Sequence, residues 1–401
     1  MNVPLENKTI LASDAPLSTP WEKRLSFQET YEYSQRHIQT IGVGFMQVMR
    51  IIEPDYEKRA STMCRYISDF QYEMYQSAQF QHYFRSRHNI PEDEHGAYLA
   101  GLVGDQGDES LLMSGRVIEF TPDRVEKELD TCPWDIVGSE VCRATVAGFS
   151  RCFDALARDG DDLMNVEMVE ARGWGDQHCR IVAENRKKYN RRQKEVWQLV
   201  GPSLSDVTCT PREEMFTQPM QLRAADRKYR NPYGAEWSRE ELFASAAVMP
   251  GASMYIIPAI RALEPDAGKV AHITRCVFEA AGKWAFAEFA AVKGMRNWLG
   301  VPDDVNDGRV LGALAGVQLG ACLIPFAITE FTPERTVIDI QKDAFLRDNH
   351  GGYPEFEHAF GALWKGMALT LVNAEWTADF AGDVPEDRFR LVIERRTDKF
   401  R

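Results

Sequence analysis

One stretch of eight residues occurs almost unchanged twice in this chain. VIEFTPDR occupies positions 117–124 and ITEFTPER occupies positions 328–335. A second match has the same spacing, because Glu53-Pro54-Asp55 recurs as Glu264-Pro265-Asp266, again 211 positions later. Two separate matches at one offset indicate a tandem duplication, so the fold must be one that a single plan can build twice.

A third match marks the far ends of the two copies. Arg180-Ile181-Val182 corresponds to Arg390-Leu391-Val392, at an offset one residue shorter than the first two. We therefore predict a first unit at residues 1–200 and a second, diverged unit at residues 201–401, each of ordinary domain size. We expect the two to pack as a pseudo-dimer, as gene-duplicated homodimers do.

Each unit is predicted to begin with a pair of helices. Apolar and aromatic residues recur at helical spacing from Thr30 to Phe84, with a break at Glu53-Pro54. The counterpart in the second copy runs from Leu242 to Trp298.

The repeated EFTP is predicted to join a strand to a helix. Leu111 to Phe120 alternates loosely, as a strand does. Thr121 can cap a helix, and Pro122 suits the first helical position. On this interpretation the motif is structural in both copies.

The remainder of each unit predicts one more helix and a pair of strands. In the first copy these are a helix from Ser139 to Arg158 and strands from Val166 to Ala171 and from Cys179 to Ala183. In the second copy they are a helix from Phe360 to Leu371 and a last strand from Arg390 to Ile393. The order favours an α+β unit in which a helix pair is followed by an antiparallel sheet backed by helices.

Composition and charge narrow the class of protein. The chain is 44% hydrophobic and 27% charged, which is typical of a folded globular protein. Its net charge of -13 argues against a nucleic-acid partner, because phosphate binding uses clustered Lys and Arg. We find no apolar stretch of about 18 residues, and Met1 to Pro20 lacks the apolar core of a signal peptide. We expect a cytoplasmic protein with a small-molecule substrate and no membrane partner, and leave oligomerisation open.

The cysteines distinguish the two copies. Cytoplasmic thiols stay reduced, so the eight cysteines are not expected to form disulfides. Three of them, Cys132, Cys142 and Cys179, correspond to other residue types in the second copy. They can form a thiolate cluster that binds zinc or contains a nucleophile, with Glu170 and His178 assisting proton transfer. The alternative is that the thiols fill small spaces in one core, and no CxxC or HExxH spacing decides between the two.

The segments that carry these thiols resemble a known family. TCPWDIVGSEVCRATVAGFSRCF, at 131–153, and VEMVEARGWGDQHCRIV, at 166–182, resemble the closing half of the L-2-amino-thiazoline-4-carboxylic acid hydrolase family. The shared features are Cys132 before a proline, Cys142, and a Gly-Asp turn leading to Cys179. The resemblance implies hydrolase chemistry.

The same stretch is also similar to the vinyl-reductase-type ligand domain of sensors for aromatic compounds. In that domain the equivalents of Cys142 and Cys179 bind zinc, and a further cysteine stands at the position of Ala171. This resemblance implies that zinc here would need another ligand. The candidates are Cys132, Glu167, Glu170 and His178.

Histidines elsewhere offer a second set of candidate catalytic groups. His88 and His95 lie in a segment rich in titratable residues, and His350 follows an aspartate in a Gly-containing loop. Among the aromatic residues, Trp134 and Trp174 are expected near the cysteines and are candidates for substrate binding.

The leading prediction is an enzyme that cleaves a small, ring-bearing molecule by hydrolysis or lyase chemistry. We predict no nucleotide or organic cofactor. No GxGxxG or GxxxxGK[ST] motif supports a nucleotide site, and no GxSxG elbow supports an α/β-hydrolase. One alternative is an acid-base lyase or isomerase that acts on an aromatic compound through histidines between the repeats. Another is a ligand-binding sensor of aromatic molecules.

Overall fold

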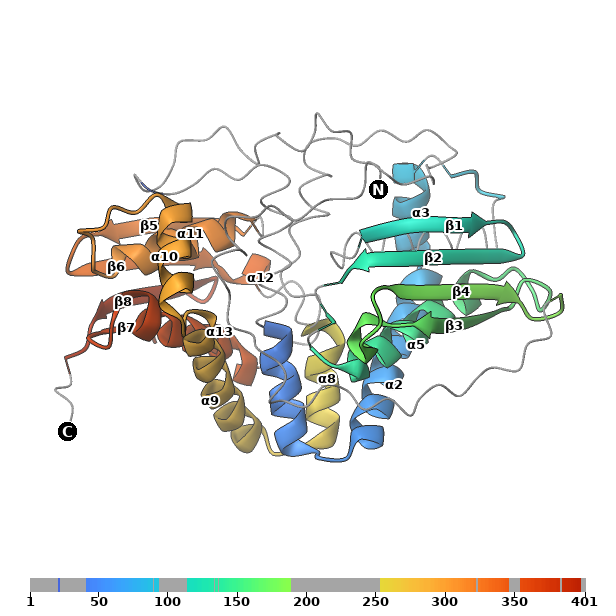
Figure 1. The fold of residues 1–401 in the computed structure, drawn as a ribbon, viewed down its shortest axis with the longest axis horizontal. Helices are drawn as coiled ribbons and strands as arrows, with labels where there is room; N and C mark the ends of the chain where they lie inside the picture. Colours follow the sequence, from blue (N-terminus) through green and yellow to red (C-terminus); the bar gives the residue numbers. More distant parts are fainter. Residues whose placement is uncertain are drawn as a thin grey trace. The chain divides into compact units, whose positions relative to one another are not determined.

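The structure, a computed structural model, describes residues 21, 41–88, 90–93, 114–132, 134–135, 137–188, 253–321, 324–345, 354–382 and 384–397 (Figure 1). The chain divides into two compact units. Unit 1 contains the described residues 53–188, and unit 2 contains residues 21, 41–52 and 253–397. The predicted boundary near residue 200 lies outside the described residues.

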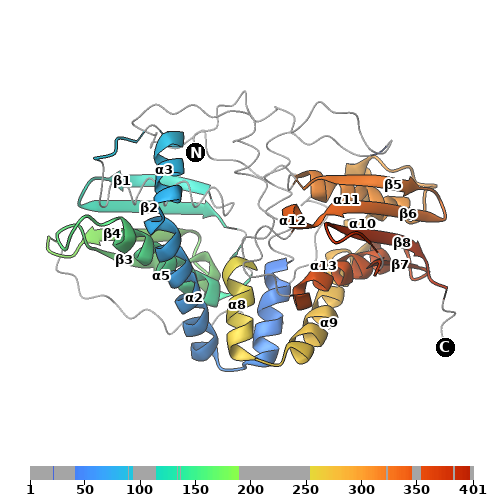
Figure 2. The same ribbon diagram turned by 180° about the vertical axis from the view of Figure 1, so that it is seen from behind.

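Unit 1 is a four-stranded antiparallel sheet with helices on one face. Its elements are α2 (Tyr56–Gln76), α3 (Ala78–His88), β1 (Ser114–Phe120), β2 (Arg124–Thr131), α5 (Ser139–Leu156), β3 (Met164–Glu170), the 3-10 turn η2 (Arg172–Trp174) and β4 (Cys179–Asn185). The strands lie in the order β1-β2-β4-β3. Helices α2 and α5 pack on each other and cover the face of the sheet that Figure 2 turns toward the viewer.

Unit 2 repeats this arrangement and adds helices. Its elements are α8 (Ser253–Leu263), α9 (Ala267–Ala285), α10 (Phe289–Leu299), α11 (Arg309–Ala321), β5 (Phe326–Phe331), β6 (Arg335–Gln341), α12 (Lys342–Phe345), α13 (Pro354–Met367), the π-helical turn η5 (Ala368–Val372), β7 (Trp376–Phe380) and β8 (Arg388–Arg395). The strand order is β5-β6-β8-β7, and α9 and α13 occupy the places of α2 and α5.

The duplication extends to local irregularities of the backbone. The first strand of each sheet has a shift of register, between Val117 and Glu119 in β1 and between Ile328 and Glu330 in β5. These two shifts lie at the offset of the sequence repeat. The predicted fold class, an α+β unit present twice with an antiparallel sheet and backing helices, is confirmed.

The repeated Glu-Pro-Asp triplet begins a helix in each unit. Asp55 caps α2 by accepting a hydrogen bond from the backbone N–H of Lys58 at 2.8 Å. Asp266 caps α9 through the N–H of Lys269 at 3.0 Å. Each cap satisfies a backbone donor that has no partner within its own helix.

The predicted role of EFTP as a strand-to-helix junction is wrong, because the motif forms a β-hairpin in both units. Thr121 Oγ1 accepts the N–H of Arg124 at 3.0 Å across the turn, and Arg124 starts β2. The Arg124 guanidinium then pairs with Glu119 of β1 and Glu184 of β4, linking three strands. A Thr-Pro pair suits a helix start and a tight turn equally well, and this charge network favours the turn.

The second copy of the motif has the same contacts. Thr332 Oγ1 accepts the N–H of Arg335 at 3.1 Å, and Arg335 pairs with Glu330 and Glu394 at 3.0 and 3.2 Å. The repeated residues therefore preserve a hairpin and the ion pairs that connect it to the neighbouring strand.

Helices α9 and α13 cross at two glycines. A Cβ atom placed on Gly282 would lie 2.0 Å from the carbonyl oxygen of Leu363, and one placed on Gly366 would lie 2.1 Å from that of Glu279. Both distances are far inside van der Waals contact, so the crossing requires residues without a side chain at these two positions.

The helical segment 41–52 packs in unit 2, although it precedes α2 in the chain. The ring of Phe45 meets that of Phe278 on α9 edge to face, with centroids 4.9 Å apart. Phe45 and Met49 are fully buried. The sequence division at residue 200 would assign this segment to the other unit.

None of the described helices is long and apolar enough to cross a membrane.

Candidate thiolate site of unit 1

Three segments of unit 1 bring the predicted cysteines together. Cys132 follows β2, Cys142 lies in the first turn of α5, and Cys179 is the first residue of β4. Gly173 in η2 packs directly on Cys142, because a Cβ there would lie only 2.6 Å from the cysteine Sγ atom. A side chain at position 173 would therefore displace the Cys142 sulfur from its place beside η2.

Cys132 and Cys179 form a hydrogen-bonded pair of thiols. The Cys132 S–H donates to the Cys179 sulfur, which lowers the pKa of Cys179 and raises that of Cys132 well above its usual value. The backbone N–H of Arg172 also donates to Cys179 Sγ, at 3.4 Å. Two donors therefore stabilise a thiolate at Cys179, which is only 3% exposed.

The other cysteines of unit 1 have the opposite tendency. Burial raises the pKa of Cys142 and of Cys152, and it raises that of Cys64 to about 11. Burial is the cause that acts on Cys152, so this thiol behaves as a small core residue. Cys179 differs because it receives hydrogen bonds from neighbouring donors.

Asp135 is a member of this site that was not predicted. Its negative charge disfavours a thiolate at Cys132, Cys142 and Cys179, so it lies near all three; at Cys179 the hydrogen bonds outweigh this effect and the pKa is lowered. The Arg172 guanidinium holds the Oδ2 atom of Asp135 at 2.8 to 2.9 Å. Within the described part of the chain, the Oδ1 atom is buried and has no hydrogen-bond partner. The signal in the sequence was a carboxylate three residues after Cys132.

Glu170 and His178 pair with each other. His178 Nε2 lies 4.0 Å from Glu170 Oε2, and both side chains are about two fifths exposed. The pair lies at the surface, where β3 ends and β4 begins. In the sequence, His178 directly precedes the buried Cys179. Their predicted role in proton transfer stays a prediction.

The two predicted tryptophans lie in the segments that carry the cysteines. Trp134 is buried two residues after Cys132, and Trp174 ends η2. The histidine candidates lie elsewhere: the side chain of His88, in α3, is not among those described, and His95 and His350 fall outside the described residues.

Zinc binding is one of the roles that the sequence allows for Cys132, Cys142 and Cys179. Thiolates are suitable zinc ligands, but no group of three or more His, Cys, Asp or Glu side chains in the described ranges is placed to hold a metal ion. The described donors thus do not fit zinc as they stand, and zinc binding stays a prediction. Elemental analysis of the purified protein and its Cys142→Ser variant would test it.

Comparisons of this chain with protein-family models, with curated proteins and with solved structures found no match. The resemblance to the thiazoline hydrolase family and to the vinyl-reductase-type domain therefore stays a prediction.

Proposed function

We propose that this protein is a cytoplasmic enzyme that opens a small, ring-bearing molecule by hydrolysis, with Cys179 as its nucleophile. The observation that carries the proposal is the hydrogen-bonded pair in which Cys132 and the Arg172 N–H both donate to Cys179. A thiolate is the reactive form of cysteine. Cys179 is the buried thiol of unit 1 that this arrangement favours as a thiolate.

The Cys132 thiol supplies the proton that such a reaction needs. Cys179 attacks the carbonyl carbon of a ring amide, a C–S bond forms, and the ring C–N bond breaks. Cys132 gives its proton to the departing nitrogen. A water molecule then returns a proton to Cys132, and its hydroxide displaces Cys179 from the acyl carbon, which restores both sulfurs and leaves a carboxylic acid.

Asp135 and Arg172 would position this pair. Arg172 contributes its backbone N–H to Cys179 and its guanidinium to Asp135, so one residue links the connection after β2 to the start of β4. Gly173 holds Cys142 next to the pair. The proposal uses no metal and no organic cofactor.

Selective alkylation tests the thiolate directly. The folded protein is treated with a small amount of iodoacetamide near neutral pH, and each cysteine is followed by peptide mass spectrometry. Cys179 should be labelled before Cys142 and Cys152, because thiolates react and thiols do not. A Cys132→Ala variant should slow labelling of Cys179, since it removes a donor. Equal labelling of all three cysteines, or no effect of Cys132→Ala, would contradict the proposal.

Catalysis is tested with a panel of cyclic amides, imines and thiazolines, measured by release of free amine or thiol. The Cys179→Ser variant should lose activity by about a thousandfold or more, as expected for loss of a nucleophile. Cys152→Ser is the matched control and should retain activity, because its thiol has only a packing role. Activity that survives in the Cys179→Ser variant would place the chemistry elsewhere.

A further inference from the structure

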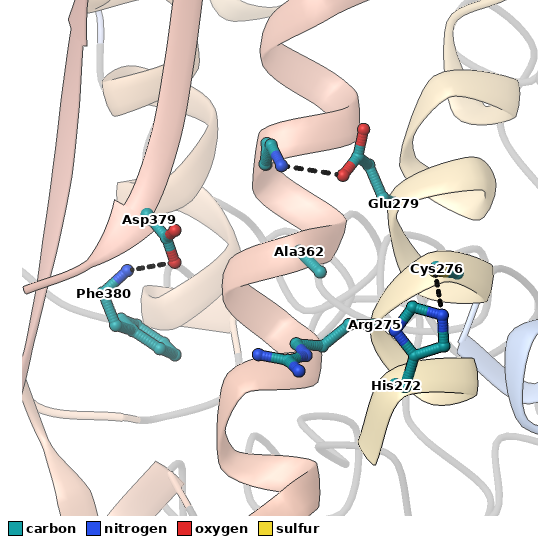
Figure 3. A pocket seen from close by; sticks show the side chains of 8 residues that line it. His272, Arg275, Cys276, Glu279, Ala362, Asp379 and Phe380 are labelled. Carbon is teal, nitrogen blue, oxygen red and sulfur yellow. Dashed lines mark hydrogen bonds and ion pairs between the residues drawn. The ribbon is translucent and has the colours of Figure 1, made fainter. Parts of the chain in front are cut away.

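Unit 2 has a polar pocket of its own, of about 430 Å³, where α9, α13 and the end of β7 meet (Figure 3). Four of its lining residues, His272, Arg275, Cys276 and Glu279, lie on one face of α9 at helical spacing. The volume is in the range of small-molecule sites. None of these lining residues was among the candidates predicted from the sequence.

The pocket contains an accessible thiol next to an imidazole. Cys276 Sγ lies 3.9 Å from His272 Nε2, one turn away on α9, and both side chains are exposed. Of the cysteines that the structure describes, Cys276 alone is exposed; the others are buried or partly buried. An imidazole at this distance can accept the thiol proton and so produce the thiolate that reacts.

The charged residues around Cys276 suit a ligand that carries both a negative and a positive group. Glu279 is already paired with Lys283 and Lys365, each at 2.9 Å. Arg275 is exposed and forms no ion pair with any described residue, and Figure 3 shows its guanidinium directed across the pocket toward α13. An unpaired guanidinium at this position is suited to a carboxylate. The exposed carboxylate of Asp379, on β7, can accept an ammonium group.

One wall of the pocket is rigid. The ring of Phe380 stacks on Phe389 with centroids 4.8 Å apart and meets Phe345 and Trp364 edge to face. These contacts fix the aromatic wall of the pocket, so the open space beside Cys276 is bounded by the sheet on one side.

The pair is specific to unit 2. At the offset of the repeat, Ser61 stands in place of His272 and Arg65 in place of Cys276. The tandem copies therefore have different thiol chemistry: a buried cluster in unit 1 and an open thiol-imidazole pair in unit 2.

We propose that Cys276 is a site of thiol-disulfide exchange that accepts a small disulfide bearing carboxylate and ammonium groups, for which glutathione disulfide is the probe. His272 takes the proton of Cys276, and the thiolate attacks one sulfur of the disulfide. A new S–S bond forms to Cys276 as the old one breaks, and the departing thiolate takes the proton from His272. The Cys276 sulfur is oxidised, and one sulfur of the small disulfide is reduced.

The product is a mixed disulfide on the protein. In the described part of unit 2, Cys276 is the only cysteine, so no second thiol there displaces the bound group. A free external thiol reverses the reaction.

The experiment measures rates of modification on the full chain by intact and peptide mass spectrometry. Glutathione disulfide should add one glutathionyl group at Cys276, and Cys276→Ser should remove that product. The same rate is then measured with a neutral probe, bis(2-hydroxyethyl) disulfide. Arg275→Gln should lower the rate at which the charged probe modifies Cys276 by about tenfold, as expected for loss of one charge-assisted contact. The rate with the neutral probe should stay nearly unchanged.

Two further variants test whether the residues of the pocket, and not only the exposure of Cys276, determine the rate of modification. His272→Asn should lower the rate of modification by both probes, because it removes the group that accepts the thiol proton. Lys293→Gln is the matched control for charge, since Lys293 is exposed on α10 and does not line the pocket. Modification that is unaffected by Cys276→Ser overturns the proposal, and so do equal effects of Arg275→Gln and Lys293→Gln on the charged probe.

Discussion

The glycine crossing in unit 2 makes a sharp prediction for the substitution Gly282→Ala. The added Cβ would lie 2.0 Å from the Leu363 carbonyl oxygen and 2.9 Å from the Met367 nitrogen. Carbon and carbonyl oxygen normally approach no closer than about 3.3 Å. The helices must therefore separate by more than about 1 Å, because the atoms in the way belong to the backbone.

The magnitude follows from two opposed effects. Overpacking of this kind costs about 3 kcal/mol or more when the neighbours cannot rotate away. Alanine in a helix returns about 1 kcal/mol relative to glycine. The net loss in the free energy of unfolding should be about 2 kcal/mol or more. For a unit of this size that lowers Tm by about 4 to 8 °C.

The same substitution at Gly320 provides the control. Gly320 lies in α11 with nothing within 4 Å of its would-be Cβ. Gly320→Ala should thus stabilise the protein by about 0.5 to 1 kcal/mol through helix propensity alone.

Urea unfolding followed by circular dichroism measures both variants, and hydrogen exchange on peptides of α9 and α13 localises the effect to unit 2. If Gly282→Ala unfolds at the same urea concentration as Gly320→Ala, the close crossing of α9 and α13 does not exist as described.

Two more predictions concern ion pairs. Arg59 and Glu140 are buried together between α2 and α5 at 2.9 Å, so Arg59→Met should cost about 3 to 5 kcal/mol by leaving a buried charge. The adjacent, exposed Lys58→Met should leave the urea midpoint nearly unchanged. The hydrogen bond from Arg390 lowers the pKa of Asp339, so this carboxylate stabilises the fold above about pH 4 and the effect is lost as the pH falls through its folded pKa. Asp339→Asn should therefore lower stability at neutral pH and weaken its decline below about pH 4 in acid titrations; an unchanged acid limb would contradict this.

The sequence predicted the duplication and the helix pair of each unit, but it missed one strand in each unit and the helices α11 and α12 of unit 2. The offset of 211 residues and the helix starts at Glu-Pro-Asp are local signals, and the structure confirms them. The strand after EFTP was missed because Thr121-Pro122 suits a helix start as well as a turn. What favours the hairpin is the pairing of Arg124 with Glu184, 60 residues later, which no local pattern contains.

The candidate site was predictable only in part, for the same reason. The loss of three cysteines from one copy identified residues that the structure places together. Asp135 was missed because its place depends on Arg172, 37 residues away. The spacing of His272 and Cys276 was visible as one helical turn, but whether that face of α9 is open depends on the packing of α13 and β7.

The place of segment 41–52 in unit 2 has a consequence for synthesis. The ribosome makes these residues before the described residues of unit 1, yet their partner α9 begins only at Ala267, some 215 residues later. At about 5 to 20 residues per second, synthesis reaches Phe278 about 12 to 47 s after Phe45, and the apolar face around Phe45 lacks this partner for that time. Unit 1 can fold during that interval, whereas unit 2 must wait for α9. A pause in translation between segment 41–52 and α9 would lengthen the time for which the apolar face around Phe45 is exposed, without changing the amino-acid sequence of the product.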